Sequence, residues 1–183
     1  LDLQAILARM RNNGVTHVVM EISSHAIDLK RIHGCALDVG VFTNLTQDHL
    51  DYHKTIESYW SCKKRLFLEH LVEGPKKERA TAVINTEDTC GKQLLEEISV
   101  PALSCGHHRE NMIWPRSFSC DLNGIRGKII TPGGEVDFNS QLVGRHNMEN
   151  ILASVGVAAA AGLNPEIIQA GINAISSVPG RLE

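Results

Sequence analysis

The sequence lacks the features that mark several broad classes of protein. No apolar run approaches the roughly 20 residues of a membrane span, and the first thirteen residues alternate charged and apolar positions, unlike a signal peptide. A net charge of -3 leaves no basic excess for nucleic acid or an anionic membrane surface. The five cysteines are odd in number, scattered and never spaced as Cys-x-x-Cys, which indicates reduced thiols in a cytosolic protein. We therefore expect no nucleic-acid partner and no membrane partner.

Short catalytic signatures are missing as well. The sequence has no Gly-x-Ser-x-Gly elbow and no active-site cysteine motif. It also has no Gly-x-x-x-x-Gly-Lys-[Ser/Thr] phosphate loop. Residues 105–108 (CGHH) hold three soft metal ligands, but no fourth ligand follows at a recognisable spacing, which disfavours zinc. Any chemistry must come from a different pattern of residues.

What is present is enough apolar sequence for one domain. Of the 183 residues, 43% are hydrophobic, and a chain of this length buries roughly 70% of its unfolded surface. It begins at Leu1 without an initiator methionine, inside an amphipathic helical pattern, and ends shortly after Val178. We interpret both ends as cut, and the chain as a piece of a longer protein.

Near-continuous apolar runs predict a parallel sheet covered on both faces, because such strands are buried on either side. The runs span residues 16–22, 37–43, 80–85 and 102–105. Between residues 113 and 143, glycines punctuate short alternating segments, which predicts antiparallel hairpins. The expected fold class is therefore α/β, a mostly parallel sheet flanked by helices, with a small antiparallel β appendage.

Apolar spacings of three and four residues predict the helices that flank this sheet. Ser23 and Ser24 open a short helix or turn, and Asp88 is placed to cap a later helix. The longer helices are expected over residues 3–10, 56–71, 88–98, 146–161 and 165–175.

Two polar clusters follow the predicted strands at their carboxyl ends, where ligands gather in open parallel sheets. The first, residues 21–25, begins with Glu21, and the second, residues 43–53, contains His49. A carboxylate and an imidazole at adjacent strand ends could share Mg2+, which keeps waters and substrate phosphates as its other ligands. Alternatively, Glu21 caps the serine-rich backbone and His49 makes a hydrogen bond within a turn.

Lys63 lies within the apolar stripe of the helix predicted over residues 56–71. At about 100° per residue, it falls close to the middle of the stripe, whereas Lys64 falls on the margin. Burial disfavours an ammonium, and a neutral amine can act as a nucleophile or react with carbon dioxide to give an anionic carbamate. The alternative is that Lys63 snorkels to the edge or pairs with a carboxylate. The stripe is formed by Ile56, Tyr59, Trp60, Leu66, Phe67 and Leu71.

Asn147 and Asn150 stand where the antiparallel appendage meets the helix predicted over residues 146–161. An asparagine at a helix start can cap the exposed backbone N–H groups. Its amide also offers both a donor and an acceptor, which suits the edge of a purine. Both roles are open at this point.

These clusters, in this order, resemble the Mur ligases, and among them the UDP-N-acetylmuramoyl-tripeptide synthetases. Residues 38–67 (DVGVFTNLTQDHLDYHKTIESYWSCKKRLF) are similar to the most recognisable stretch of that group. Residues 18–32 (VVMEISSHAIDLKRI), 142–154 (LVGRHNMENILAS) and 178–183 (VPGRLE) resemble its strand with a serine pair, its asparagine helix start and its domain junction. The resemblance implies that residues 1–178 are part of the ATP-binding central domain and that 179–183 begin the linker to a C-terminal domain.

The resemblance implies an ATP-dependent amide ligase of peptidoglycan precursor synthesis. ATP would convert a carboxylate of UDP-N-acetylmuramoyl-L-alanyl-D-glutamate to an acyl phosphate, which the amine of diaminopimelate or lysine would attack. Glu21, His49 and a carbamylated Lys63 would serve this chemistry by binding Mg2+. Such a reaction demands charge neutralisation and alignment around the phosphates more than covalent help from the protein.

The same resemblance assigns the substrate contacts. Ser23 and Arg31 would touch the UDP-muramoyl-peptide, and Asn147 and Asn150 would lie near the adenine of ATP. Leu29 departs from the family, where glutamine is common two residues before the arginine.

Other departures concern the rest of the enzyme. His146 stands where the family often has an aromatic residue. The phosphate loop is expected upstream of Leu1 and the domain that selects the amino acid beyond Glu183. We therefore expect this piece alone to be inactive and the full-length enzyme to be a monomer.

Two alternatives remain. Other ligases of the superfamily, such as folylpolyglutamate synthetase or cyanophycin synthetase, typically lack the LDYH continuation found at residues 50–53. A non-catalytic binding module that kept the fold and lost the phosphate loop would fit a gene that starts near Leu1.

Overall fold

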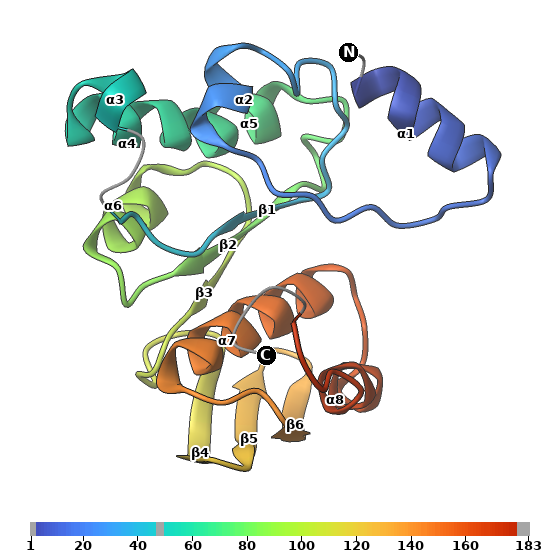
Figure 1. Ribbon diagram of the computed structural model, residues 1–183, viewed down its shortest axis with the longest axis vertical. Coiled ribbons are helices and arrows are strands. Elements are labelled where there is room, and N and C mark those ends of the chain that lie inside the picture. Colours follow the sequence, from blue (N-terminus) through green and yellow to red (C-terminus); the bar gives the residue numbers. More distant parts are fainter. Residues whose placement is uncertain (1–2, 47–49, 179–183) are drawn as a thin grey trace.

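The computed structural model describes residues 3–46 and 50–178 (Figure 1). Its first sheet has three parallel strands in the order β1-β2-β3. Four of the five positions in the central strand β2 are buried, as expected of a strand covered on both faces. The predicted parallel α/β core is confirmed. The strands are β1 (Val39–Phe42), β2 (Thr81–Asn85) and β3 (Ala102–Cys105).

Helices flank this sheet, and three of them begin at side-chain caps, one of which is described with the cleft below. Thr55 Oγ1 accepts the Ser58 N–H at the start of α4. Asp88 Oδ1 accepts the Cys90 N–H at the start of α6, which confirms the cap predicted for Asp88. The helices are α1 (Leu3–Asn12), α2 (Ser24–Asp28), α3 (Leu50–His53), α4 (Ile56–Arg65), α5 (Leu71–Glu73) and α6 (Thr89–Glu97).

Between α4 and α5 the helix widens into a π-helical turn, η1 (Leu66–His70). The Leu71 N–H donates to the Leu66 carbonyl, five residues back instead of four. Leu66, Phe67 and Leu71 nevertheless all stay in the hydrophobic core. The helix predicted over residues 56–71 is confirmed, but its hydrogen bonding is not α-helical throughout.

The second sheet is a three-stranded antiparallel meander. Its strands are β4 (Trp114–Asp121), β5 (Gly124–Thr131) and β6 (Gly134–Ser140). Gly124 has a φ of +127°, and a Cβ there would lie 2.0 Å from the Ser140 carbonyl oxygen, so this turn requires glycine. The antiparallel appendage predicted from the glycine pattern is confirmed.

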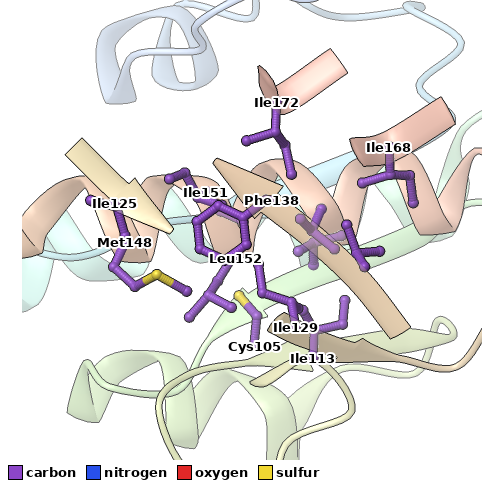
Figure 2. Close-up of a cluster of buried hydrophobic side chains, with 14 residues drawn as sticks. Cys105, Ile113, Ile125, Ile129, Phe138, Met148, Ile151, Leu152, Ile168 and Ile172 are labelled. Atoms are coloured by element: carbon purple, nitrogen blue, oxygen red, sulfur yellow. The ribbon is translucent and has the colours of Figure 1, made fainter. Parts of the chain in front are cut away.

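Helix α7 (Arg145–Ala160) runs between the two sheets, and α8 (Pro165–Asn173) packs against β6 (Figure 1). A Cβ at Gly156 would lie 2.5 Å from Val83 Cγ1, so the glycine allows α7 to approach β2 closely. No helix within the described residues, α7 included, is long and apolar enough to span a membrane. Figure 2 shows the core shared by α7 and both sheets, with Met148, Ile151, Leu152, Ile125, Ile129, Phe138 and Cys105 among its members.

A second core lies on the other face of the parallel sheet. Successive residues of a strand point to opposite faces, and accordingly Val83 belongs to the core around α7 while Ile84 belongs to the second core. Phe42 of β1 joins the second core and lies 5.3 Å, ring centre to ring centre, from Trp60 of α4. The parallel sheet is therefore covered on both sides.

The strand expected at residues 16–22 is absent, and that prediction is wrong. Val18 is 47% exposed and Val19 is 93% exposed. In the part of the chain that the structure describes, β1 pairs with β2 along one edge and with no strand along the other. A strand exists only through hydrogen bonds to a neighbour, so residues 16–22 remain irregular despite their apolar composition.

Candidate active-site cleft

A cavity of about 1730 Å³ opens between residues 16–24, strand β1 and the start of α7. Three residues of the loop 43–46, which follows β1, form part of its wall. We call this cavity the cleft. It gathers predicted site residues from separate stretches of the chain, namely Glu21, Ser23, Lys63, Asn147 and Asn150.

Glu21 and Ser23 reach the cleft where the chain enters α2. Ser23 is the N-cap of this helix, and its Oγ accepts the Ala26 N–H at 3.2 Å. Glu21 is exposed and precedes the cap by two residues. The alternative in which Glu21 caps the serine-rich backbone is therefore wrong, since Ser23 has that role.

Lys63 is half-buried and borders the cleft. Its Nζ donates to the Asn44 carbonyl at 3.4 Å and lies 5.1 Å from the centre of the Tyr59 ring. Tyr59 and Phe67, four residues to either side of Lys63, are both buried, so Lys63 keeps its predicted place on the apolar stripe, although its side chain is only half-buried. The alternative, in which the lysine reaches the edge of the stripe, describes the observed side chain.

Two residues hold the loop 43–46 in place, one at the carboxyl end of β2 and one shortly after it. Asn85 Nδ2 donates to the Thr43 carbonyl at 2.7 Å, and Asp88 Oδ2 accepts the Leu45 N–H at 2.7 Å. Sequence reasoning missed Asn85 and gave Asp88 only a capping role. A signal was available, because Asn85 is a polar residue at the carboxyl end of an apolar run.

At the other wall, the start of α7 uses a glycine cap. Gly144 is the N-cap, with a φ of 90° and no side-chain hydrogen bond. Asn147 Nδ2 donates instead to the Val143 carbonyl at 2.8 Å, and Asn150 Nδ2 donates to Asn147 Oδ1 at 3.0 Å. The capping role left open for these asparagines is therefore not observed, and both amides border the cleft.

A cluster of polar and aromatic side chains ties α2 to α3 and α4. His53 Nε2 lies 2.8 Å from Ser24 Oγ, and Tyr52 donates its hydroxyl to Asp28 Oδ2 at 2.6 Å. Cys62 Sγ donates to the Ser24 carbonyl at 3.2 Å. No separate role is predicted for these residues from sequence, and they hold α2 against α3 and α4 beside the cleft.

The cysteines are structural. Burial, together with the nearby carboxylates of Glu149 and Glu87, raises the pKa of Cys105 to about 12. Burial likewise raises the pKa of Cys62 and of Cys35. Because the thiolate is the nucleophilic form, a raised pKa makes these thiols unreactive. All five cysteines are unpaired.

Of the two remaining predicted site residues, one lies away from the cleft and the other lies outside the described residues. Arg31 is exposed and is not among the described residues that line it. His49 lies outside the described residues, so its role as a metal ligand stays a prediction. The linker expected at residues 179–183 lies outside them too. Within the described ranges, no group of three or more His, Cys, Asp or Glu side chains gathers that could hold a metal ion.

Comparison with known proteins identifies the family. The family model for the Mur ligase middle domain matches residues 1–158. The UDP-N-acetylmuramoyl-L-alanyl-D-glutamate--2,6-diaminopimelate ligase of Geobacter metallireducens is 45% identical over 183 residues, which is 100% of this chain and 36% of that protein. The ligase of the same name from Nostoc sp. is 41% identical over 185 residues, with the same coverage of both chains. This chain therefore spans about a third of the length of these relatives.

Solved structures agree with the sequence relatives. A structure of UDP-N-acetylmuramoyl-L-alanyl-D-glutamate--2,6-diaminopimelate ligase matches with a TM-score of 0.87 and 26% identity, covering 100% of this chain and 37% of that chain. A pseudomurein peptide ligase type C from Methanothermus fervidus, at 18% identity and a TM-score of 0.60, shares the fold over 88% of this chain and 38% of its own. Since the family model covers most of the chain and full-coverage relatives exceed 40% identity, the chain belongs to the Mur ligase family.

Proposed function

We propose that the full-length protein carrying this chain is an ATP-dependent amide ligase that adds diaminopimelate to UDP-N-acetylmuramoyl-L-alanyl-D-glutamate. The observation that carries the proposal is the cleft, which brings five predicted site residues to one cavity. Diaminopimelate is favoured over lysine because the relatives compared above carry it in their names. The unpaired cysteines fit a cytosolic enzyme.

The proposed reaction has two steps. The terminal phosphoryl group of ATP moves to a carboxylate oxygen of the peptide, giving ADP and an acyl phosphate. The amine of diaminopimelate then attacks the acyl carbon, phosphate leaves with the bonding electrons, and the amine loses a proton to become an amide. The chain's contribution to both steps is to align the reactants and to stabilise charge.

The two walls of the cleft suit different reactants. Asn147 and Asn150 present amide groups at the α7 wall, where we propose that they lie near the adenine of ATP. Ser23 borders the opposite side, where we propose that it contacts the UDP-muramoyl-peptide. Arg31, exposed beyond α2, would reach the same substrate from outside the cleft.

The donor set fits magnesium. Mg2+ prefers oxygen ligands and keeps several waters, and Glu21 provides an exposed carboxylate in the cleft. We propose that Glu21, His49 and a carbamylated Lys63 hold the ion. When bound, it supplies positive charge beside the phosphates.

Carbamylation would reverse the charge that Lys63 carries to the cleft. The neutral Nζ bonds to carbon dioxide and one proton is released, which leaves an anionic carbamate with one remaining N–H. That N–H can keep the Asn44 carbonyl as its acceptor, as Nζ does now. The Asn44 carbonyl and the face of Tyr59 also suit an ammonium, so the modification exchanges a cation for an anion at this wall.

The test is a ligation assay on the full-length protein. We expect ADP release that requires UDP-N-acetylmuramoyl-L-alanyl-D-glutamate, Mg2+ and diaminopimelate, with lysine a far poorer amine donor. The 183-residue chain serves as the control and should not turn over, because the relatives are nearly three times as long. Absence of ADP release from the full-length protein would favour the binding-module alternative, and equal use of lysine would overturn the proposed amino acid.

A further inference from the structure

Asn85 is a buried amide that bonds to three separate parts of the chain. Its side chain is 4% exposed at the carboxyl end of β2. Nδ2 donates to the Thr43 carbonyl at 2.7 Å and to Glu149 Oε2 at 3.2 Å. Oδ1 accepts the Glu87 N–H at 3.0 Å. Each polar atom of the amide is therefore in use.

The two acceptors of Asn85 belong to two separate segments that border the cleft, the loop 43–46 and the start of α7. Thr43 lines the cleft in the loop 43–46. The carbonyl of the next residue, Asn44, accepts a hydrogen bond from the Lys63 ammonium. Glu149 stands on α7 between Asn147 and Asn150, which line the other wall. Asn85 itself is not among the described residues that line the cleft, so it joins the walls from behind.

The chemistry at this point requires an amide. The Thr43 carbonyl and the Glu149 carboxylate both need a donor, while the Glu87 N–H needs an acceptor, and only a side-chain amide supplies two donors and an acceptor on one short group. An aspartate has the same shape but cannot donate when ionised, so it would set three acceptors against one another. Unmatched polar groups are costly when buried.

We propose that Asn85 is a positioning residue of the ligase site, which sets the spacing between the loop beside Lys63 and the start of α7. The inference rests on the function proposed above. Asn85 touches neither substrate, and it acts through Thr43 on one wall and through Glu149 on the other. The hydrogen bond to Thr43 and the hydrogen bond to Glu149 should therefore affect different kinetic constants.

The hydrogen bond between Asn85 and Glu149 predicts an effect on nucleotide binding. In the full-length enzyme, Glu149→Ala should raise the KM for ATP on the order of tenfold, with a smaller change in kcat, because the asparagines on either side lose their anchor. Glu149→Gln keeps an acceptor oxygen for Asn85 and should recover most of the loss. A merely structural role would not separate KM from kcat in this way.

The hydrogen bond between Asn85 and the Thr43 carbonyl predicts an effect on the chemical step. Asn85→Asp should lower kcat on the order of tenfold to a hundredfold in addition to raising the KM for ATP, because the loop beside Lys63 also shifts. The matched control is Asn139→Asp, the same change at an exposed position on β6. That control should retain wild-type kinetics.

The outcomes separate the inference from the function it rests on. Lack of ligation by the wild-type enzyme overturns the proposed function, whatever the variants do. If the wild type ligates while Asn85→Asp folds and keeps its kcat and KM, Asn85 does not position the site. If Asn85→Asp fails to fold, the Glu149 pair decides. A wild-type KM in Glu149→Ala, or equal losses in Glu149→Ala and Glu149→Gln, would overturn the inference.

Discussion

At the scale of single residues, Lys63 and Lys64 form a natural comparison within one helix. Both side chains are half-buried. Lys63 borders the cleft and donates to the Asn44 carbonyl. Lys64 makes a 2.7 Å ion pair with Glu97 and lies 5.6 Å from the centre of the Trp60 ring. The two neighbouring lysines are therefore similarly buried but have different partners, a backbone carbonyl at the cleft for Lys63 and a carboxylate for Lys64.

Lys63→Ala should strongly reduce turnover of the full-length enzyme, because the proposed carbamate and its negative charge are lost. A fall in kcat on the order of a hundredfold to a thousandfold is expected, as for removal of one electrostatic group in an active site. Added formate or acetate should restore part of the activity by supplying a carboxylate in the vacated space. The measurement is phosphate release with and without these anions.

Lys64→Ala is the matched control for that substitution. Its ion pair with Glu97 is partly exposed, and such pairs contribute little to stability, so activity should stay within about twofold of wild type. Full activity in Lys63→Ala would exclude the carbamate. Equal losses in the two variants would instead point to a general weakening of α4.

At the scale of secondary-structure elements, two helix caps differ in one respect. Asp88 caps α6 and also accepts the Leu45 N–H from the loop 43–46. Asn164 caps α8 by accepting the Ile167 N–H at 3.0 Å. The first cap therefore belongs to a helix and to the cleft, whereas the second serves its helix alone.

Asp88→Ala should destabilise the fold more than Asn164→Ala does. Loss of a cap costs about 1 kcal/mol, and loss of the partner of the Leu45 N–H adds about 1 kcal/mol more. Urea unfolding of the two variants and the wild type measures the difference. Equal costs would mean that the contact between Asp88 and Leu45 does not stabilise the loop.

The elements also show what sequence could and could not predict. Helices and caps were predictable because a helix satisfies its backbone within its own segment, so that local spacing and a residue such as Asp88 suffice. The apolar run at residues 16–22 carries the same signal as β1, yet within the described residues it pairs with no strand. The apolar spacing could not predict the π-helical turn at Leu66–His70, because the apolar residues of the turn are buried just as an α-helix would bury them.

The candidate site was predictable to a similar degree. Polar residues at strand ends and helix starts, such as Glu21 and Asn147, could be found from their position along the chain and do line the cleft. Asn85 has the same kind of position, at the end of an apolar run, but its role could not be predicted, because it depends on Thr43 and Glu149, which lie 42 and 64 residues away in sequence. The pattern along the chain identifies candidate site residues, whereas contacts across the fold identify the residues that position them.

At the scale of the whole molecule, α7 makes the two sheets share one core. Leu152 is 1% exposed in this core, where residues of β2 and β3 meet residues of β5 and β6 (Figure 2). Neither sheet can lose α7 without exposing apolar surface of its own. We therefore expect the chain to unfold in one cooperative transition.

Two tryptophans allow that expectation to be measured. Trp60 reports on α4, and Trp114 reports on β4. Urea unfolding of Trp60→Phe and of Trp114→Phe is followed by the fluorescence of the remaining tryptophan. We expect the two unfolding curves to coincide once they are corrected for the difference in stability between the two variants. In either background, Leu152→Ala should shift the midpoint by a free energy of about 2–5 kcal/mol.

The control for the core substitution is Leu122→Ala. Leu122 is 95% exposed at the turn between β4 and β5, so removing its side chain should change stability by less than about 0.5 kcal/mol. Two separate transitions, or a loss on Leu152→Ala that only one tryptophan registers, would show that the sheets unfold independently.

The π-helical turn has a consequence for the gene. A turn with hydrogen bonds to the fifth residue back holds one residue more than an α-helical turn, which is what insertion of a single codon into a helix leaves behind. Deleting one codon between 66 and 70 would let the turn close as an ordinary α-helix, with Lys63 before it and Leu71 after it still facing their present sides. Deleting one codon within α4 would instead rotate everything downstream by about 100°. Reading frames of different length can therefore encode this helix, provided that they differ at the π-helical turn.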